Sequence, residues 1–201
     1  MRIPDLSGPA RFACLLPLLA ISACGQAVPQ SNSSAASVRP ETVVAAFYKE
    51  VVARHPIAGM GDPKVFGPYL SRGLHRRFDD NAACFQDWVR QNPGTTDKPP
   101  FGQLEMGVYS GANERSNPQA FHIEKTEAGE HGAARISVKL TYAEPTFKLL
   151  WHVAVVVVRE NGRPVVDDVI YLKDDDNPEE WRLSEVLGRE CKGPRWRGYQ
   201  D

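Results

Sequence analysis

The sequence predicts an α+β fold: helices come first, an antiparallel sheet follows, and a short helix comes last. Between residues 40 and 90, apolar side chains recur every three or four positions, which is the period of a helix. From residue 121 they alternate with polar side chains, which is the period of a strand. Because the strands follow the helices instead of alternating with them, the pattern indicates an α+β class.

Two helices are expected in the first half of the chain. Pro40 suits a first helical turn, and His55-Pro56 ends the apolar repeat that begins at Val43. Residues 57–68 are rich in Gly and Pro and predict a loop. Ser71 then offers an N-cap for a second helix. The expected apolar stripe of that helix consists of Leu74, Phe78, Ala82, Phe85 and Val89.

Strands are expected from Phe101 onward. Residues 121–127 and 134–142 alternate, and residues 127–132 predict the turn of a hairpin between them. The most apolar stretch, residues 153–158, predicts a central strand covered on both faces, because such a strand would aggregate at an exposed edge.

The last third of the chain carries clear turn and cap signals. Asn161-Gly162 predicts a tight hairpin turn, and residues 163–172 form the partner strand, with Pro164 near its start. A short final helix is expected to be capped by Asn177, to hold Pro178 in its first position and to end at Gly188. Its apolar stripe is Leu183, Val186 and Leu187.

The N-terminus has the features of a secretory signal. Arg2 and Arg11 precede the apolar run Phe12–Ala23, which is too short to span a bilayer but suits the apolar core of a signal peptide. The run ends in Ile21-Ser22-Ala23-Cys24, which resembles the lipobox of bacterial lipoproteins. In such proteins the cysteine is acylated, for example with palmitate, and becomes the first residue of the mature chain. An ordinary secretory signal that is cut nearby is the alternative.

The chain is therefore expected to have three parts: a lipoprotein signal peptide (1–23), a flexible tether (24–39) and a single α+β domain (40–201). The tether is small and polar, with almost nothing to bury. Gly25 follows the cysteine, where an aspartate would retain many lipoproteins in the inner membrane. The predicted location is the bacterial cell envelope, in the outer membrane and facing the periplasm, with the lipid anchor as the membrane contact.

Charge and motifs exclude several classes of function. The chain has 24 basic and 25 acidic residues, of which the first 23 residues hold two and one, so the remaining 178 residues have a net charge of −2. This near-neutral charge offers no field for nucleic acid. The sequence contains no C-x-x-C, His-Glu-x-x-His or Cys/His cluster, so we expect neither a metal site nor a cofactor.

Four cysteines occur in the sequence. Cys14 is lost with the signal peptide and Cys24 is the predicted acylated residue, which leaves Cys84 and Cys191. Two cysteines in an oxidising compartment favour a disulfide bond. The alternative is a pair of buried thiols that act as small apolar side chains.

Several stretches resemble a family of small bacterial periplasmic lipoproteins that is classed as a domain of unknown function. They are VVAAFYKEVV, PYLSRGLHRRF, DKPPFGQ and WHVAVVVVRENGRPVVDDVIYL. Trp151, Gly162 and Asp167-Asp168 match the family's last hairpin, whereas Pro164 stands where a second tryptophan is common. The resemblance implies a nuclear-transport-factor-2-like (cystatin-like) cone, in which N-terminal helices pack on a strongly curved antiparallel sheet. It implies no activity.

Cones of this type often hold a pocket inside the sheet, and some use acidic, His and Tyr side chains there for acid–base chemistry. By this resemblance the candidate pocket residues are Asp168, His152 and Tyr142, with Asp167 and Tyr171 beside them. Strict alternation would place Asp168 on the face of Val166 and Ile170. In the alternative interpretation, the two aspartates bond to backbone and His152 is a core or edge residue. A fold that enzymes share with other proteins does not decide between these interpretations.

Three hypotheses for function follow. The leading one is an envelope lipoprotein without catalytic activity, an accessory or binding module that meets a protein or a small ligand. The alternatives are an acid–base enzyme that uses the cone pocket and a periplasmic inhibitor or immunity protein. A weak homodimer through the outer sheet face is also expected, since residues 153–158 need cover on both faces.

Overall fold

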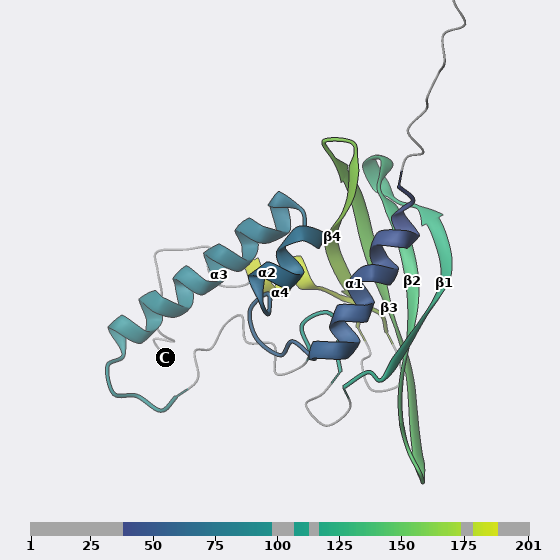
Figure 1. Cartoon of the computed structure of the whole chain (residues 1–201). Coiled ribbons are helices and arrows are strands. Elements are labelled where there is room, and N and C mark those ends of the chain that lie inside the picture. The colour runs from purple at the N-terminus through teal and green to yellow at the C-terminus, as the bar shows by residue number, and fades with distance from the viewer. Residues whose placement is uncertain (1–37, 98–106, 113–116, 174–178, 189–201) are drawn as a thin grey trace, which may run out of the picture. The chain divides into compact units, whose positions relative to one another are not determined.

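The computed structural model describes residues 38–97, 107–112, 117–173 and 179–188 (Figure 1). The helical elements are α1 (Pro40–Arg54), α2 (Pro63–Phe66), the 3-10 turn η1 (Gly67–Tyr69), α3 (Arg72–Gln91), the 3-10 turn η2 (Glu130–Gly132) and α4 (Leu183–Gly188). The strands are β1 (Ala120–Ala128), β2 (Ala134–Glu144), β3 (Phe147–Glu160), β4 (Arg163–Tyr171) and β5 (Trp181–Arg182). The predicted α+β class and the short C-terminal helix are confirmed.

The sheet is antiparallel, with the strand order β1-β2-β3-β4-β5. β3 lies at its centre, as the apolar run of residues 153–158 predicts. Core side chains come from alternate positions of β2 and β3, so one face of the sheet packs against the helices. On β2 these are Ile136, Val138 and Leu140, and on β3 they are Val153, Val155 and Val157. This face is called the inner face below, and the opposite one the outer face.

Helix α1 begins and ends where the sequence predicts. Pro40 occupies its first turn, and His55 ends it in the left-handed conformation with φ of 47°. Its buried side chains, Val44, Phe47, Tyr48 and Val51, recur at helical spacing and lie in the core. The segment predicted to be a loop, residues 57–68, contains the short helix α2 and the first two residues of η1. Its Gly and Pro content gives no signal for either element.

Helix α3 is capped as predicted but is buried only at its start. The Ser71 hydroxyl accepts a hydrogen bond from the Leu74 amide at 2.9 Å. Leu74 and Phe78 are buried, whereas Phe85 and Val89 are 37% and 42% exposed. The predicted stripe is therefore wrong beyond Phe78. The 20-residue helix is about 30 Å long, and its second half extends away from the sheet (Figure 1).

Residues 107–112 form a tight turn on the inner face, where the sequence predicted a strand. The Gly107 amide donates to the Ala112 carbonyl at 2.6 Å, and the Gly111 amide donates to the Gly107 carbonyl at 2.8 Å. Val108 and Tyr109 are fully buried in the core. We call residues 107–112 the plug, because they fill space on the inner face that a cone pocket would need.

Three consecutive carbonyl oxygens of the plug accept hydrogen bonds from aromatic side chains. Tyr171 of β4 donates to the Val108 carbonyl at 2.5 Å. Tyr48 of α1 donates to the Tyr109 carbonyl at 2.8 Å, and Trp151 of β3 donates to the Ser110 carbonyl at 2.8 Å. Burial raises the pKa values of the Tyr48 and Tyr171 hydroxyls well above their usual range, so both remain donors at neutral pH.

The aromatic ring of Tyr109 fastens the plug to the helices. Its centroid lies 4.8 Å from that of Phe47, 5.2 Å from that of Phe66 and 6.2 Å from that of Phe78. These rings come from α1, α2 and α3, and such pairs add about 0.5–1.5 kcal/mol each beyond the area that they bury. The Tyr109 hydroxyl donates to the Met60 carbonyl at 2.9 Å.

The final helix starts later than predicted. Helix α4 begins at Leu183, and Trp181–Arg182 before it pairs with β4 as strand β5. Glu179 and Glu180 therefore precede the helix, and the predicted cap residues Asn177 and Pro178 lie outside the described residues. The predicted stripe is confirmed, because Leu183, Val186 and Leu187 are buried.

Gly111 provides a test of how tightly the plug is packed. Its φ is +67°, and a Cβ atom there would lie 2.8 Å from the Tyr171 ring. Gly132 has a φ of +79°, but a Cβ atom there would meet nothing within 4 Å. We expect Gly132→Ala to lower the free energy of unfolding by about 1–2 kcal/mol through backbone strain alone. Gly111→Ala should lower it by about 1–3 kcal/mol more, because overpacking adds to the strain. Urea denaturation measures both, and equal losses would contradict the packing of the plug.

Candidate functional site

Two of the candidate pocket residues, Asp167 and Asp168, lie in β4 at a β-bulge. Val156 of β3 pairs with Asp168, but the next residue, Val157, pairs with Val166, so Asp167 has no partner across the ladder. As a result Val166 and Val169 both lie in the core. The expectation that Asp168 shares a face with Val166 is therefore wrong, because the bulge shifts the alternation by one residue.

Asp168 is buried and holds the start of helix α4. Its carboxylate accepts hydrogen bonds from the Ser184 amide at 2.9 Å and the Ser184 hydroxyl at 2.6 Å. It also accepts one from the Val169 amide at 2.9 Å. Burial is the largest influence on this carboxyl group and raises its pKa above the usual value, while these hydrogen bonds and Arg182 act in the opposite direction. Asp168 thus replaces the N-cap that the sequence assigned to Asn177.

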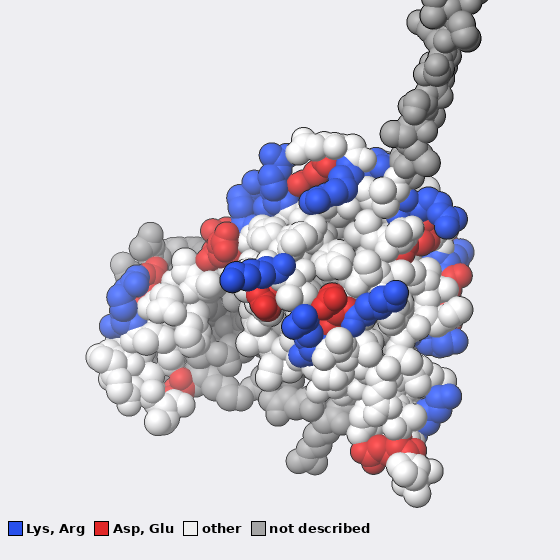
Figure 2. All heavy atoms as spheres, viewed as in Figure 1, with Lys and Arg blue, Asp and Glu red and all other residues white. Residues whose placement is uncertain are grey.

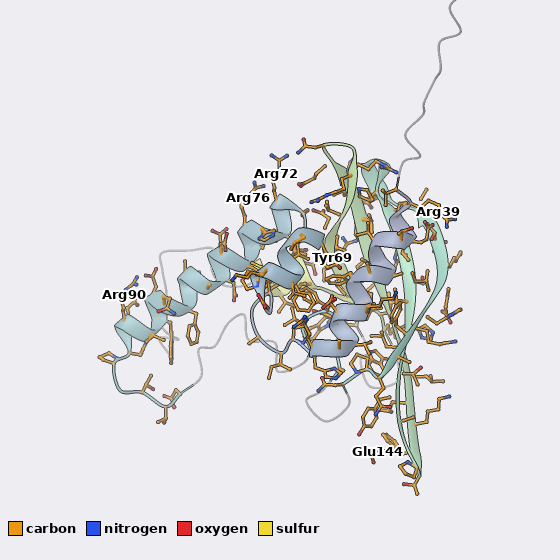
Figure 3. All side chains as sticks on the ribbon, viewed as in Figure 1. Arg39, Tyr69, Arg72, Arg76, Arg90 and Glu144 are labelled. Atoms are coloured by element: carbon orange, nitrogen blue, oxygen red, sulfur yellow. The ribbon has the colours of Figure 1, made fainter. Side chains whose placement is uncertain are left out.

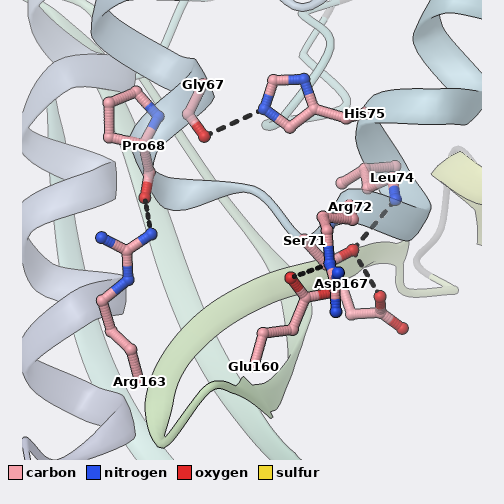
Figure 4. Close-up of polar contacts among 9 residues, drawn as sticks. All are labelled: Gly67, Pro68, Ser71, Arg72, Leu74, His75, Glu160, Arg163 and Asp167. Carbon is pink, nitrogen blue, oxygen red and sulfur yellow. Dashed lines mark hydrogen bonds and ion pairs between the residues drawn. The ribbon is translucent and has the colours of Figure 1, made fainter.

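Asp167 holds the start of helix α3 in a similar way (Figure 4). Its carboxylate accepts a hydrogen bond from the Ser71 hydroxyl at 2.6 Å, and that hydroxyl caps the helix by accepting from the Leu74 amide. The Ser71 amide in turn donates to the Val166 carbonyl at 2.8 Å. A carboxylate of β4 therefore fixes the rotamer of an N-cap on a helix almost a hundred residues earlier.

Glu160 and Arg163 strengthen the same junction from the turn between β3 and β4 (Figure 4). The Glu160 carboxylate accepts from the Arg72 amide at 3.1 Å and pairs with its guanidinium at 3.3 Å. Arg163 donates to the Pro68 carbonyl at 3.3 Å. Carboxylates near a helix N-terminus are stabilising because they satisfy amides and oppose the helix dipole.

The three pocket candidates lie at different places on the sheet. Tyr142 pairs with Leu149 near the tip of the β2–β3 hairpin, and its hydroxyl bonds to Glu144. His152 is exposed on the outer face, with Nε2 3.4 Å from Glu124. The partners of Tyr142 and Asp168 on β3, Leu149 and Val156, are seven residues apart, or about 23 Å along the strand. The structure does not bring Asp168, His152 and Tyr142 together.

A groove of about 640 Å³ lies on the outer face, where the sequence predicts no site. Val156 and Val158 of β3 line it together with Ile170 of β4. The turn between β1 and β2 lines one side, and β5 contributes Arg182. No motif marks this groove, because its residues come from four separate stretches of the chain. Its remaining lining residues are Ala128, Gly129, Glu130, His131, Ala133, Arg135 and Asp167.

Only one of the three cysteines in the lipidation and disulfide predictions belongs to the described residues. Cys24 and Cys191 lie outside the described residues. Cys84 lies on α3, nearly two turns beyond the last buried residue of that helix, and is half-buried. The Cys84–Cys191 bond and the acylation of Cys24 therefore stay predictions.

Comparisons of the chain with models of protein families, with curated proteins and with solved structures give no match. Among the described residues, no cluster of three or more His, Cys, Asp or Glu side chains could hold a metal ion. In the same part of the chain, no helix has both the length and the apolar character that a membrane span requires. Figure 2 shows Lys and Arg interspersed with Asp and Glu on the face that it presents.

The raised pKa of Asp168 predicts how its contribution to stability depends on pH. The pKa of this carboxyl group is higher in the folded state than in the unfolded state, where it is about 3.9. Such a group stabilises the fold fully at a pH below its unfolded-state pKa. It loses this contribution as the pH rises through its folded-state pKa. Compared with Asp168→Asn, the native chain should therefore gain free energy of unfolding as the pH falls from 7 to 4. Denaturation at several pH values measures the difference.

The matched control for this experiment is Glu130→Gln, which changes a carboxylate at an exposed turn. Its difference from the native chain should stay within about 0.5 kcal/mol over the same pH range. A difference between the native chain and Asp168→Asn that is constant with pH, or that reverses in sign, would contradict the burial of Asp168.

Proposed function

We propose that this protein is an envelope lipoprotein without catalytic activity, an accessory or binding module that is held in the outer membrane by acylated Cys24 and faces the periplasm. The sequence supports the anchor through the short apolar run Phe12–Ala23, the lipobox-like end and the small polar tether that follows. Two or more acyl chains give stable attachment, which the lipoprotein modification supplies.

The observation that carries the binding role is the filled inner face. The plug puts Val108 and Tyr109 where an internal pocket would lie, and Tyr48 and Tyr171 use their hydroxyls to hold it. The carboxylates that could take part in acid–base chemistry, Asp167 and Asp168, are engaged in capping helices. These contacts favour recognition by the outer surface over chemistry inside the sheet.

The first described residue contacts the sheet near one of its ends. The Val38 carbonyl accepts a hydrogen bond from Arg159 at 3.2 Å, close to the end of β3. Arg39 and Glu144 lie at opposite ends of the body (Figure 3). The far end of the β2–β3 hairpin carries Phe147 and Leu150, which are half exposed. This end of the hairpin therefore offers exposed apolar side chains that a partner could contact.

The anchor is tested by the substitution Cys24→Ala. We expect it to abolish incorporation of a labelled fatty acid and to leave the precursor uncleaved or mislocalised, because the acylated thiol is gone. Cys14→Ala, which removes a cysteine inside the signal, is the control and should label as the native chain does. Metabolic labelling followed by membrane fractionation gives both readouts. Label that persists in Cys24→Ala would refute the lipoprotein proposal.

The proposed disulfide between Cys84 and Cys191 predicts a large effect on stability. In the chain-entropy model, a bond that closes a loop of this length gains about 4–5 kcal/mol. Cys84→Ser and Cys191→Ser should each lower the melting temperature, and the double variant should lose little more than either single variant. Ala83→Ser, on an exposed neighbouring position, is the control. Mass spectrometry of the periplasmic protein that finds two free thiols would overturn this proposal.

A further inference from the structure

The groove on the outer face has the dimensions and the mixed lining of a small-molecule site. Its volume of about 640 Å³ falls within the roughly 300–1,000 Å³ that is common for such sites. Val156 and Val158 alternate along β3 with the core residues Val155 and Val157, so they belong to the outer face. They give the groove an apolar floor, which the almost fully buried Ile170 adjoins.

Two arginines line the groove from different strands. Arg135 of β2 pairs directly across the ladder with Val156, and Arg182 of β5 pairs with Ile170. The two guanidinium groups are therefore attached on either side of the apolar floor. Their side chains are 38% and 44% exposed, so both are accessible to a ligand from solution.

In the described part of the chain, the guanidinium groups of Arg135 and Arg182 form ion pairs but no hydrogen bonds. Arg135 lies 3.6 Å from the Glu180 carboxylate, and Arg182 lies 3.8 Å from the Asp168 carboxylate. Both distances exceed that of a hydrogen bond, so these contacts are ion pairs only. Each guanidinium has five N–H donors in a fixed fork that matches a carboxylate or phosphate.

The two aspartates beside the groove, in contrast, already accept hydrogen bonds. Asp168 accepts three hydrogen bonds, and Asp167, which also lines the groove, accepts one from Ser71 at 2.6 Å. Glu130 lies at the rim, in the turn between β1 and β2, beside His131. The unused donors next to the apolar floor thus favour a ligand with an anionic head over one with a cationic head.

We propose that the outer-face groove binds an amphipathic carboxylate of the fatty-acid type. Arg135 and Arg182 bind its carboxylate, and its acyl chain lies on Val156 and Val158. The site does not depend on the lipid anchor, because every residue in it belongs to the described domain. It deepens the proposed binding role by naming the chemical class of the ligand.

The test is photolabelling of the purified full chain, kept in one neutral maltoside detergent, with octanoate that carries a diazirine on its chain. Peptide mapping by mass spectrometry should find the label on residues that line the groove. Excess octanoate should remove it, and excess octanamide, which has the same chain without the charge, should not. The double variant Arg135→Gln/Arg182→Gln should reduce labelling about tenfold or more, as expected for the loss of charge-assisted hydrogen bonds. Arg90→Gln, on the far half of α3, is the control and should label normally.

Three results would overturn the proposal: label that is spread outside the groove, equal competition by octanamide, or unchanged labelling of the double variant.

The homodimer that the sequence predicts would use the same face. Light scattering on the same samples detects it, and a dimer whose groove takes no label would assign this face to a second copy. Because Cys24→Ala tests the anchor separately, a failure of the proposed anchor and a failure of this site give different results.

Discussion

The fold depends on the way in which three neighbouring peptide carbonyls are satisfied inside the core. The carbonyls of Val108, Tyr109 and Ser110 accept hydrogen bonds from Tyr171, Tyr48 and Trp151, which belong to β4, α1 and β3. A buried carbonyl that loses its donor costs about 1–3 kcal/mol. The plug therefore links one helix and two strands through hydrogen bonds to its backbone.

The bulge in β4 is the second constraint, because it aims two neighbouring carboxylates at two different helices. Asp167 fixes the cap of α3 through Ser71, and Asp168 fixes the start of α4 through Ser184. In a regular strand these side chains would point to opposite faces, and Val166 and Val169 could not both lie in the core. The Asp-Asp pair, which the sequence presents as a candidate for acid–base chemistry, forms the junction between the sheet and the helices in this structure.

The sequence predicts most of the elements, because their signals are local. Pro40, Ser71 and Asn161-Gly162 mark boundaries through backbone chemistry, and the alternation of Ile136, Val138 and Leu140 follows from burial of one face. The plug, the bulge and the cap of α4 depend on partners that are distant in the chain, such as the pair Tyr48 and Tyr109, which are 61 residues apart. The outer-face groove has the same origin: Arg135 and Arg182 have no sequence pattern in common and are brought to one floor by the strand order. The exposure of Phe85 and Val89 could not be predicted, since the periodicity of a helix does not show where its support ends.

Amide hydrogen exchange of the plug tests the central claim most directly. The Val108 amide donates to the Pro56 carbonyl at 3.0 Å, and the Gly111 amide donates to the Gly107 carbonyl. If the plug is part of the core, both amides should exchange only through global unfolding, with the same opening free energy as the amides of the central strand β3. Opening free energies for Val108 and Gly111 several kcal/mol below those of β3 would show that the plug detaches from a folded sheet. That result would contradict the account, because it would leave the inner face open to a ligand.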